Sequence, residues 1–140
     1  MRQHLRGERL HIVTNEQSMP RGSKRYKPKK QADGTYRVAL LGSDTHVMTV
    51  DAHALDLLEQ VRRWRVVHDS WTSYAIVDRC ADKTLPILRM PAHRLLMGDP
   101  PEPGLTVDHL DGCGLNNTCA NLRWATKTEQ NLNRRRCPRR

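Results

Sequence analysis

The sequence of 140 residues lacks any apolar run that approaches the roughly 20 residues of a membrane-spanning helix. It also lacks the charged segment, apolar segment and small-residue cleavage site that make up a secretory leader. No internal repeat is visible, and the chain is too short for two large domains. We therefore expect one cooperative unit that stays in a reducing cytoplasm and has no membrane partner.

The cysteines form no CxxC pair, which excludes a dithiol redox motif and the paired spacing of a zinc knuckle. They are Cys80, Cys113, Cys119 and Cys137. Free thiols are the expectation. The alternative is a zinc-stabilised interaction module in which Cys113, Cys119 and one distant cysteine hold the ion, because the loop around the first two can close on a metal.

Positive charge is concentrated at both ends of the chain. Residues 1–30 carry a net charge of +7, residues 31–120 carry −4 and residues 121–140 carry +6. A chain with a neutral to acidic middle and two basic ends is suited to binding a polyanion, because each lysine or arginine near a phosphate releases condensed counterions. Nucleic acid is the predicted partner, and solvated basic tails are the alternative.

The chain divides into three parts. Residues 1–34 are rich in Lys, Arg, Gly and Pro with little to bury, which predicts a flexible basic arm. Residues 35–104 form an accessory α+β region, and residues 105–140 form a separate motif with a basic tail. In the accessory region, alternating apolar residues over 35–50 predict a hairpin whose turn contains Gly42.

Further elements of the accessory region follow from apolar spacing and from caps. Asp51 is expected to cap a helix that buries Ala54, Leu55, Leu58 and Val61 on one face. Strands are predicted over 64–67, 71–77 and 87–89, and a short helix over 91–98. The aromatic side chains of these strands are expected in the core, namely Trp64, Trp71 and Tyr74.

Residues 105–136 predict a ββα unit. A strand over 105–108 is followed by a Gly- and Asn-rich loop over 111–120, a strand over 121–124 and a helix. Thr126 and Glu129 have the spacing of a capping box, so the helix should begin there, and Pro138 should end it by Cys137.

Polar side chains are concentrated in this unit. Asp108 and His109 end its first strand, and amides follow on the second strand and the helix at Asn121, Gln130, Asn131 and Asn133. Carboxylate and amide oxygens suit Mg²⁺ or Mn²⁺ rather than zinc. Histidine is a base that titrates near neutral pH.

The segments VDHLDG, LNN, ANLRWAT and NLNRR, in this order and spacing, closely resemble the HNH endonucleases of phage and intron-homing type. The preceding region resembles the accessory half of the same family, so that the resemblance covers residues 37–136. It implies that Asp108 ligates the metal, that His109 is the general base, and that Asn121 steadies the loop and orients the histidine.

The chain departs from the family on the helix. The family's helix asparagine falls at Gln130, with Asn131 next to it. One residue along a helix rotates a side chain by about 100°, so only one of the two can face the metal, and the alignment favours Gln130. Asp108 and His109 are adjacent in a strand, so they can share a centre only if the strand ends or bulges there.

Other polar residues are candidates for contacts with nucleic acid. Asn116 and Asn117 are expected to shape the loop. His93 recurs in the family just before the catalytic unit, and it is expected either to pack behind the centre or to contact phosphate. The candidate phosphate contacts, for which a solvated role is the alternative, are His93, Arg94, Arg123, Asn133, Arg134 and Arg135.

Together these observations predict an α+β protein in which a small antiparallel sheet with one or two helices precedes a ββα-metal motif. The resemblance implies an endonuclease of double-stranded DNA that uses one Mg²⁺ or Mn²⁺ per centre and leaves 5′-phosphate and 3′-hydroxyl ends. It would act as a monomer or homodimer in a bacterial or phage-infected cell. A DNA-binding protein with a degenerate centre is the alternative, motivated by Gln130.

Overall fold

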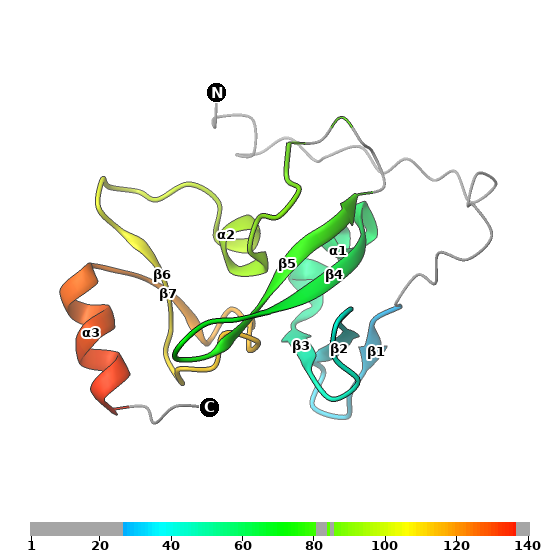
Figure 1. The fold of residues 1–140 in the computed structure, drawn as a ribbon, viewed down its shortest axis with the longest axis horizontal. Coiled ribbons are helices and arrows are strands. Elements are labelled where there is room, and N and C mark those ends of the chain that lie inside the picture. The colour runs from blue at the N-terminus through cyan, green and yellow to red at the C-terminus, as the bar shows by residue number, and fades with distance from the viewer. Residues whose placement is uncertain (1–26, 81–83, 85, 137–140) are drawn as a thin grey trace.

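The computed structural model describes residues 27–80, 84 and 86–136, and its architecture is α+β, as predicted. Three antiparallel β units follow one another along the chain, and short helices lie between and after them (Figure 1). No helix within these residues is both long and apolar enough to cross a membrane. A long central hairpin separates the N-terminal sheet from the C-terminal helix.

The N-terminal sheet contains β1 (Lys29–Lys30), β2 (Tyr36–Ala39) and β3 (Val47–Val50) in sequential antiparallel order. β2 and β3 confirm the predicted hairpin, and Gly42 in their connection has a φ of 93°, a backbone conformation that favours glycine. β1 differs from prediction, because Lys29–Lys30 pairs with β2 and so takes part of the predicted arm into the sheet. The rest of that arm, residues 1–26, lies outside the described residues.

The helix predicted from Asp51 is shorter and differently built. A 3-10 turn, η3 (Ala52–Ala54), leads into α1 (Leu55–Gln60), and Val61 already begins the next strand. Asp51 precedes the turn without capping it through its side chain. Leu58 and Val61 are nonetheless both buried, so the expected apolar face is used.

The central hairpin contains β4 (Val61–His68), which extends beyond the predicted strand 64–67 at both ends, and β5 (Ser73–Cys80), which begins later and ends later than the predicted strand 71–77. α2 (Ala92–Met97) confirms the predicted short helix between Pro91 and Gly98. The predicted strand 87–89 is wrong: this segment forms turns beside β5, and Arg89 adopts a positive φ of 65°. Ile87 is anchored in the core, and the prolines on either side oppose extended pairing.

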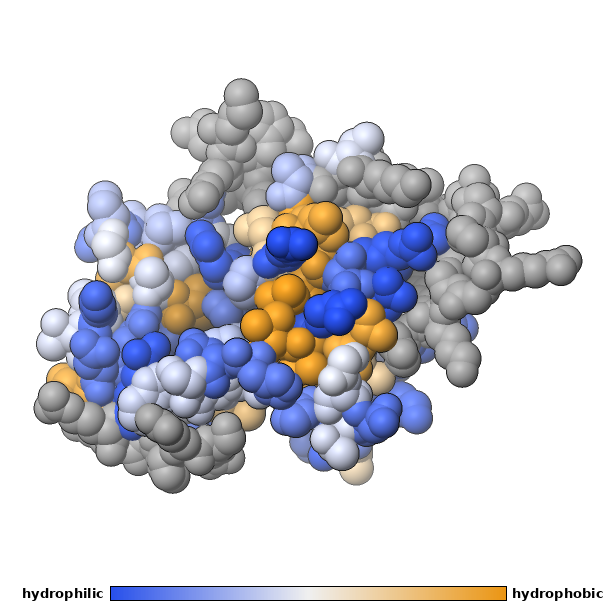
Figure 2. Space-filling model, in the orientation of Figure 1, coloured by the Kyte–Doolittle hydropathy of each residue, from blue (hydrophilic) through white to orange (hydrophobic). Residues whose placement is uncertain are grey.

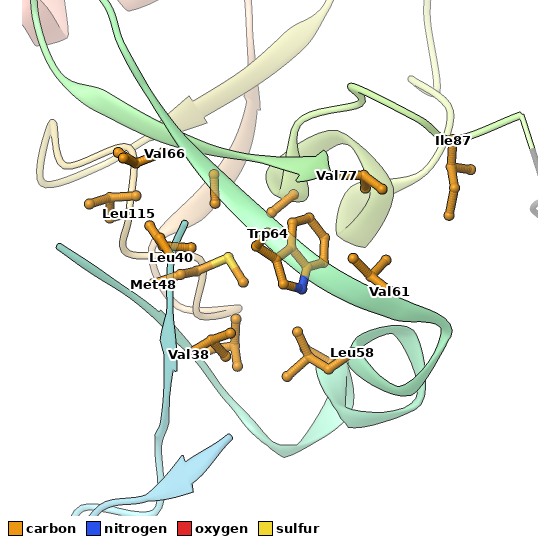
Figure 3. Close-up of a cluster of buried hydrophobic side chains, with 14 residues drawn as sticks. Val38, Leu40, Met48, Leu58, Val61, Trp64, Val66, Val77, Ile87 and Leu115 are labelled. Carbon is orange, nitrogen blue, oxygen red and sulfur yellow. The ribbon is translucent and has the colours of Figure 1, made fainter. Parts of the chain in front are cut away.

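The core lies between β4–β5 and the elements around them (Figure 3). Trp64 crosses its centre and is 2% exposed, as expected for a core residue. Trp71 and Tyr74 are only half-buried, which corrects the prediction that they are core residues. Leu115 belongs to the Gly- and Asn-rich loop over 111–120, called the C-terminal loop below. It joins the same cluster, so this loop is packed onto the accessory region.

The C-terminal unit contains β6 (Thr106–His109), β7 (Leu122–Ala125) and α3 (Lys127–Arg136). β6 and β7 are antiparallel, and the pairing sets Asp108 opposite Arg123. The capping box is confirmed: Glu129 Oε2 accepts from the Thr126 N–H at 2.7 Å, and Thr126 Oγ1 accepts from the Glu129 N–H at 3.3 Å. Hydrophilic side chains dominate the surface over α3, whereas apolar ones gather over β4–β5 (Figure 2).

Gly114 makes a close approach between the C-terminal loop and the hairpin. A Cβ atom there would lie 2.5 Å from Tyr74 Cδ1 and closer still to the carbonyl oxygen of Ser73. We expect Gly114→Ala to lower the free energy of unfolding by about 2–3 kcal/mol, because backbone cannot yield as a flexible side chain does.

Urea unfolding followed by circular dichroism measures this effect. Gly104→Ala is the matched control, because nothing lies within 4 Å of a Cβ there. Because Gly104 has a φ of 85°, alanine there should cost about 1 kcal/mol of backbone strain and no steric clash. Equal effects of the two substitutions would contradict the close packing of the loop.

Candidate active site

A pocket opens where β6 ends, between the tip of the β4–β5 hairpin, α2 and α3. Six predicted site residues line it: His93, Asp108, His109, Gln130, Asn133 and Arg134. His109 is the last residue of β6, so the alternation of adjacent strand side chains ends there and both Asp108 and His109 reach the pocket. The remaining lining residues are Trp71, Thr72, Tyr74, Val107 and Gly112.

The His109 imidazole is held by its neighbours at one nitrogen and open at the other. The side chain is buried, and Nε2 is 2.9 Å from Asn117 Oδ1, which accepts its proton. Nδ1 has no hydrogen-bond partner among the described residues and is not sealed from the pocket. This arrangement fixes the tautomer and leaves the Nδ1 lone pair available as a base.

The protonation of His109 is set mainly by its burial. Burial lowers the pKa of His109 below its ordinary value of 6.5, while the hydrogen bond to Asn117 and the charges of Asp111 and Asp108 act in the opposite direction. Because burial prevails, the imidazole is neutral at neutral pH, which is the form a general base requires.

Asn117 is the partner that the sequence did not identify. Its side chain is fully buried, and its backbone N–H donates to the carbonyl oxygen of Thr49 at 2.8 Å. The Thr49 N–H donates in turn to Leu115 O at 2.8 Å, so the loop is paired with β3. Asn117 was expected only to shape the loop, and the structure also gives it the role of orienting His109.

Asn121 closes the loop, in agreement with the first role that the resemblance implies for it. Its Oδ1 accepts from the Asp111 N–H at 3.0 Å, and its Nδ2 donates to Asp111 Oδ1 at 2.9 Å and to Asn116 O at 2.8 Å. The side chain is buried. It does not hydrogen-bond to His109, so the predicted second role of Asn121, orienting the histidine, belongs to Asn117.

Asp108 lies at the centre of a polar cluster. Arg123 donates to its Oδ2 from Nε at 3.1 Å and from Nη2 at 3.0 Å, and Asn133 Nδ2 donates to the same oxygen at 3.2 Å. Oδ1 accepts no hydrogen bond within the described part of the chain. Asn133 Nδ2 also donates to the carbonyl oxygen of His109 at 2.8 Å. Arg123 and Asn133, predicted to contact nucleic acid, therefore face Asp108.

The helix brings Gln130 and Asn133 to the pocket but not Asn131. Gln130 and Asn133 are three residues apart and share one face of α3. The Gln130 carboxamide contacts Thr106 Oγ1 on β6. Asn131 is exposed and does not line the pocket, which corrects its prediction as an alternative ligand. The reason is the helical rotation of about 100° per residue.

His93 packs against His109 at the wall of the pocket. Its ring centroid lies 5.0 Å from that of His109 in an edge-to-face arrangement and 5.4 Å from that of Tyr74. Its Nδ1 is buried and has no hydrogen-bond partner within residues 27–80, 84 and 86–136. These contacts agree with the predicted packing role of His93, and its predicted contact with phosphate stays a prediction.

Acid should destabilise the protein through His93. Burial, and then the nearby charges of His109 and Arg94, lower the pKa of His93 from 6.5 to about 3. A folded-state pKa below the unfolded value stabilises the protein fully above pH 6.5, and this stabilisation is lost as the pH falls from 6.5 towards 3. We expect a loss of about 2 kcal/mol from this group between pH 7 and pH 5.

Urea unfolding at pH 7, 6 and 5 measures the loss, in a range where carboxylates titrate little. His93→Phe keeps a ring of similar size and should flatten the dependence, whereas the exposed His68→Asn controls for the number of histidines. An unchanged pH dependence in His93→Phe would contradict the assignment.

Of the predicted basic contacts, one described side chain borders the pocket. Arg134 lines it and is exposed, and its Cζ lies 5.9 Å from the centroid of the half-buried Trp71 ring. Arg94 is exposed but does not line the pocket. Arg135 belongs to α3, but the structure does not describe its side chain, so its predicted contact stays a prediction. The rim of the pocket therefore carries one described cation, Arg134, next to an aromatic face.

The chain was compared with protein-family models, with curated proteins and with solved structures, and none of the three comparisons gives a match. A function for this pocket is therefore inferred from the sequence and from the chemistry of its own residues.

Proposed function

We propose that the protein is a divalent-metal-dependent endonuclease that hydrolyses phosphodiester bonds of double-stranded DNA. The observation that carries this proposal is the pairing, in one open pocket, of a neutral histidine base with a carboxylate and two carboxamides. His109 Nδ1 accepts no hydrogen bond from any residue that the structure describes, and Asp108, Gln130 and Asn133 line the same pocket. The resemblance of these segments to HNH endonucleases supports the same conclusion.

The residues around Asp108 fit a hard cation such as Mg²⁺ or Mn²⁺. Among the described residues Asp108 Oδ1 accepts no hydrogen bond, and Asp108 Oδ2 and the His109 carbonyl oxygen both lie near the Asn133 carboxamide. Rotation of that carboxamide by 180° exchanges its nitrogen for an oxygen and makes the donor set all-oxygen. Asp108 and Asn133 would hold the ion, and Gln130 is positioned on the same side.

When bound there, a divalent ion would screen the charge of the phosphate and stabilise the departing 3′ oxygen. The chain supplies the remaining functions. His109 Nδ1 takes a proton from the attacking water, while the hydrogen bond to Asn117 holds the ring in place. The products are a 5′-phosphate and a 3′-hydroxyl.

DNA is the proposed substrate because positive charge borders the pocket. Arg134 lies at its rim, and residues 121–140 carry a net charge of +6. Lysine and arginine side chains placed along a phosphate backbone bind it without regard to sequence. Trp71, next to Arg134, adds an aromatic face beside the pocket.

A second candidate function keeps DNA binding without catalysis. It is favoured by the engagement of Asp108 with Arg123 and of Gln130 with Thr106, which occupies groups that a metal would need. The endonuclease proposal requires these contacts to open when an ion and DNA bind.

Incubation of the purified protein with supercoiled plasmid separates the two candidates. An endonuclease converts the plasmid to open-circular or linear forms in Mg²⁺ or Mn²⁺, and a chelator stops the reaction. Nicks with 5′-phosphate and 3′-hydroxyl ends are resealed by DNA ligase, which tests the polarity of hydrolysis. Protein that retards DNA in a gel but never nicks it with any divalent ion would support the non-catalytic candidate instead.

A further inference from the structure

A second group of metal-ligating side chains lies outside the pocket, where the C-terminal loop meets the start of η3. It consists of Asp51, His53 and Cys119, whose ligand atoms all lie within 4.8 Å of one another. Cys119 Sγ is 3.2 Å from Nδ1 and 3.3 Å from Nε2 of His53. Asp51 Oδ1 contacts His53 Nδ1, and Asp51 Oδ2 accepts from the Cys119 N–H at 2.8 Å.

We propose that Asp51, His53 and Cys119 form a zinc site that joins the C-terminal loop to the accessory region. Zinc binds thiolate sulfur at about 2.3 Å and imidazole nitrogen at about 2.0 Å, so ligand atoms of a tetrahedral site lie about 3.5 Å apart. The separations between Cys119 Sγ and the ring nitrogens of His53 are close to this value. A soft thiolate with an imidazole favours zinc over Mg²⁺.

The charges of the three ligands suit a doubly charged cation. Metal binding removes the thiol proton of Cys119, and the resulting thiolate and the Asp51 carboxylate together balance the charge of Zn²⁺. The Asp51 carboxylate does not cap η3 and instead contacts both other residues of the group. The group lies at the surface, where His53 is 42% and Asp51 31% exposed, so water can fill the fourth position.

The position of the group gives the zinc a structural role. Cys119 lies between Asn117, which holds His109, and Asn121, which closes the loop. Asp51 and His53 directly follow β3, with which this loop pairs at Thr49. A zinc ion would therefore fasten the loop to the accessory region beside the hydrogen bonds already described. This ligand set differs from the zinc site considered from the sequence, which combined Cys113, Cys119 and one distant cysteine, because Cys113 is not part of the group.

Metal analysis of the full chain tests the proposal without any assay of DNA cleavage. After equilibration with Zn²⁺ under reducing conditions and removal of loose metal, the protein should retain about one zinc per chain. Co²⁺ in its place should give the thiolate-to-cobalt absorption of a sulfur ligand. Zinc should also raise the thermal midpoint of unfolding, because it binds only the folded arrangement.

Matched variants locate the ion. Cys119→Ser and His53→Asn, both at exposed positions, should weaken zinc binding at least about 100-fold, since even partners behind a metal ligand contribute 10- to 100-fold. Cys113→Ala and Asp108→Asn should bind zinc as the wild type does. Failure of the wild type to retain zinc, or retention of zinc by Cys119→Ser with the same affinity, would overturn the proposal. The result is independent of the proposed nuclease function.

Discussion

Replacement of His109 by alanine is expected to lower the rate of Mg²⁺-dependent DNA nicking by about 10²- to 10⁴-fold, the range that a positioned general base contributes. The reason is the geometry of the ring: Nε2 is held by Asn117, and Nδ1 is the nitrogen left to take a proton from water. Single-turnover conversion of supercoiled plasmid at saturating protein measures the chemical step apart from DNA binding.

Two controls separate a chemical effect from a structural one. His109 is buried, so unfolding of the alanine variant is measured by circular dichroism, and rates are compared only under conditions in which both proteins are folded. His68→Ala changes an exposed histidine at the end of β4 and should nick at the wild-type rate. Folded His109→Ala that retains more than a tenth of the wild-type rate would exclude His109 as the base.

Replacement of Asn121 by alanine is expected to lower the free energy of unfolding by about 4 kcal/mol. The substitution removes three hydrogen bonds inside the loop, and each polar group left without a partner in the interior costs about 1–3 kcal/mol. The Asp111 N–H and the Asn116 carbonyl oxygen lose their partner, whereas the Asp111 carboxylate keeps the Cys113 N–H and Asn116 Nδ2. Urea unfolding monitored by circular dichroism gives the difference.

Asn131→Ala is the matched control, because Asn131 is exposed on α3 and lies outside the pocket. It should change the free energy of unfolding by no more than about 0.5 kcal/mol. An effect of Asn121→Ala as small as that of the control would show that the loop is held by other contacts.

The parts of the fold that were predicted are those with local signals. The capping box of Thr126 and Glu129 fixes the start of α3 within four residues of sequence. The turn at Gly42 and the Pro91–Gly98 bounds of α2 are similarly local. Each of these features depends on interactions between residues close together along the chain, so the local sequence was enough to predict it.

The parts that were missed depend on contacts distant in sequence or on exact helical phase. Asn117 orients His109 because the loop pairs with Thr49, nearly seventy residues earlier, and the run LNN gave no sign of this pairing. Asn133, rather than Asn131, reaches Asp108 because the position and rotation of α3 turn the side chain of Asn133 towards β6. The group of Asp51, His53 and Cys119 likewise exists only after the loop has packed.

The most direct test of the proposed centre is the binding of Mn²⁺ followed by nuclear magnetic resonance, because a paramagnetic ion broadens only the signals of nearby nuclei. The signals of His109 and of the Asn133 side-chain amide should broaden in wild type, recover with excess Mg²⁺, and remain sharp in Asp108→Asn. Broadening confined to the surroundings of His53 and Cys119, or none at these pocket residues, would contradict a catalytic metal beside His109.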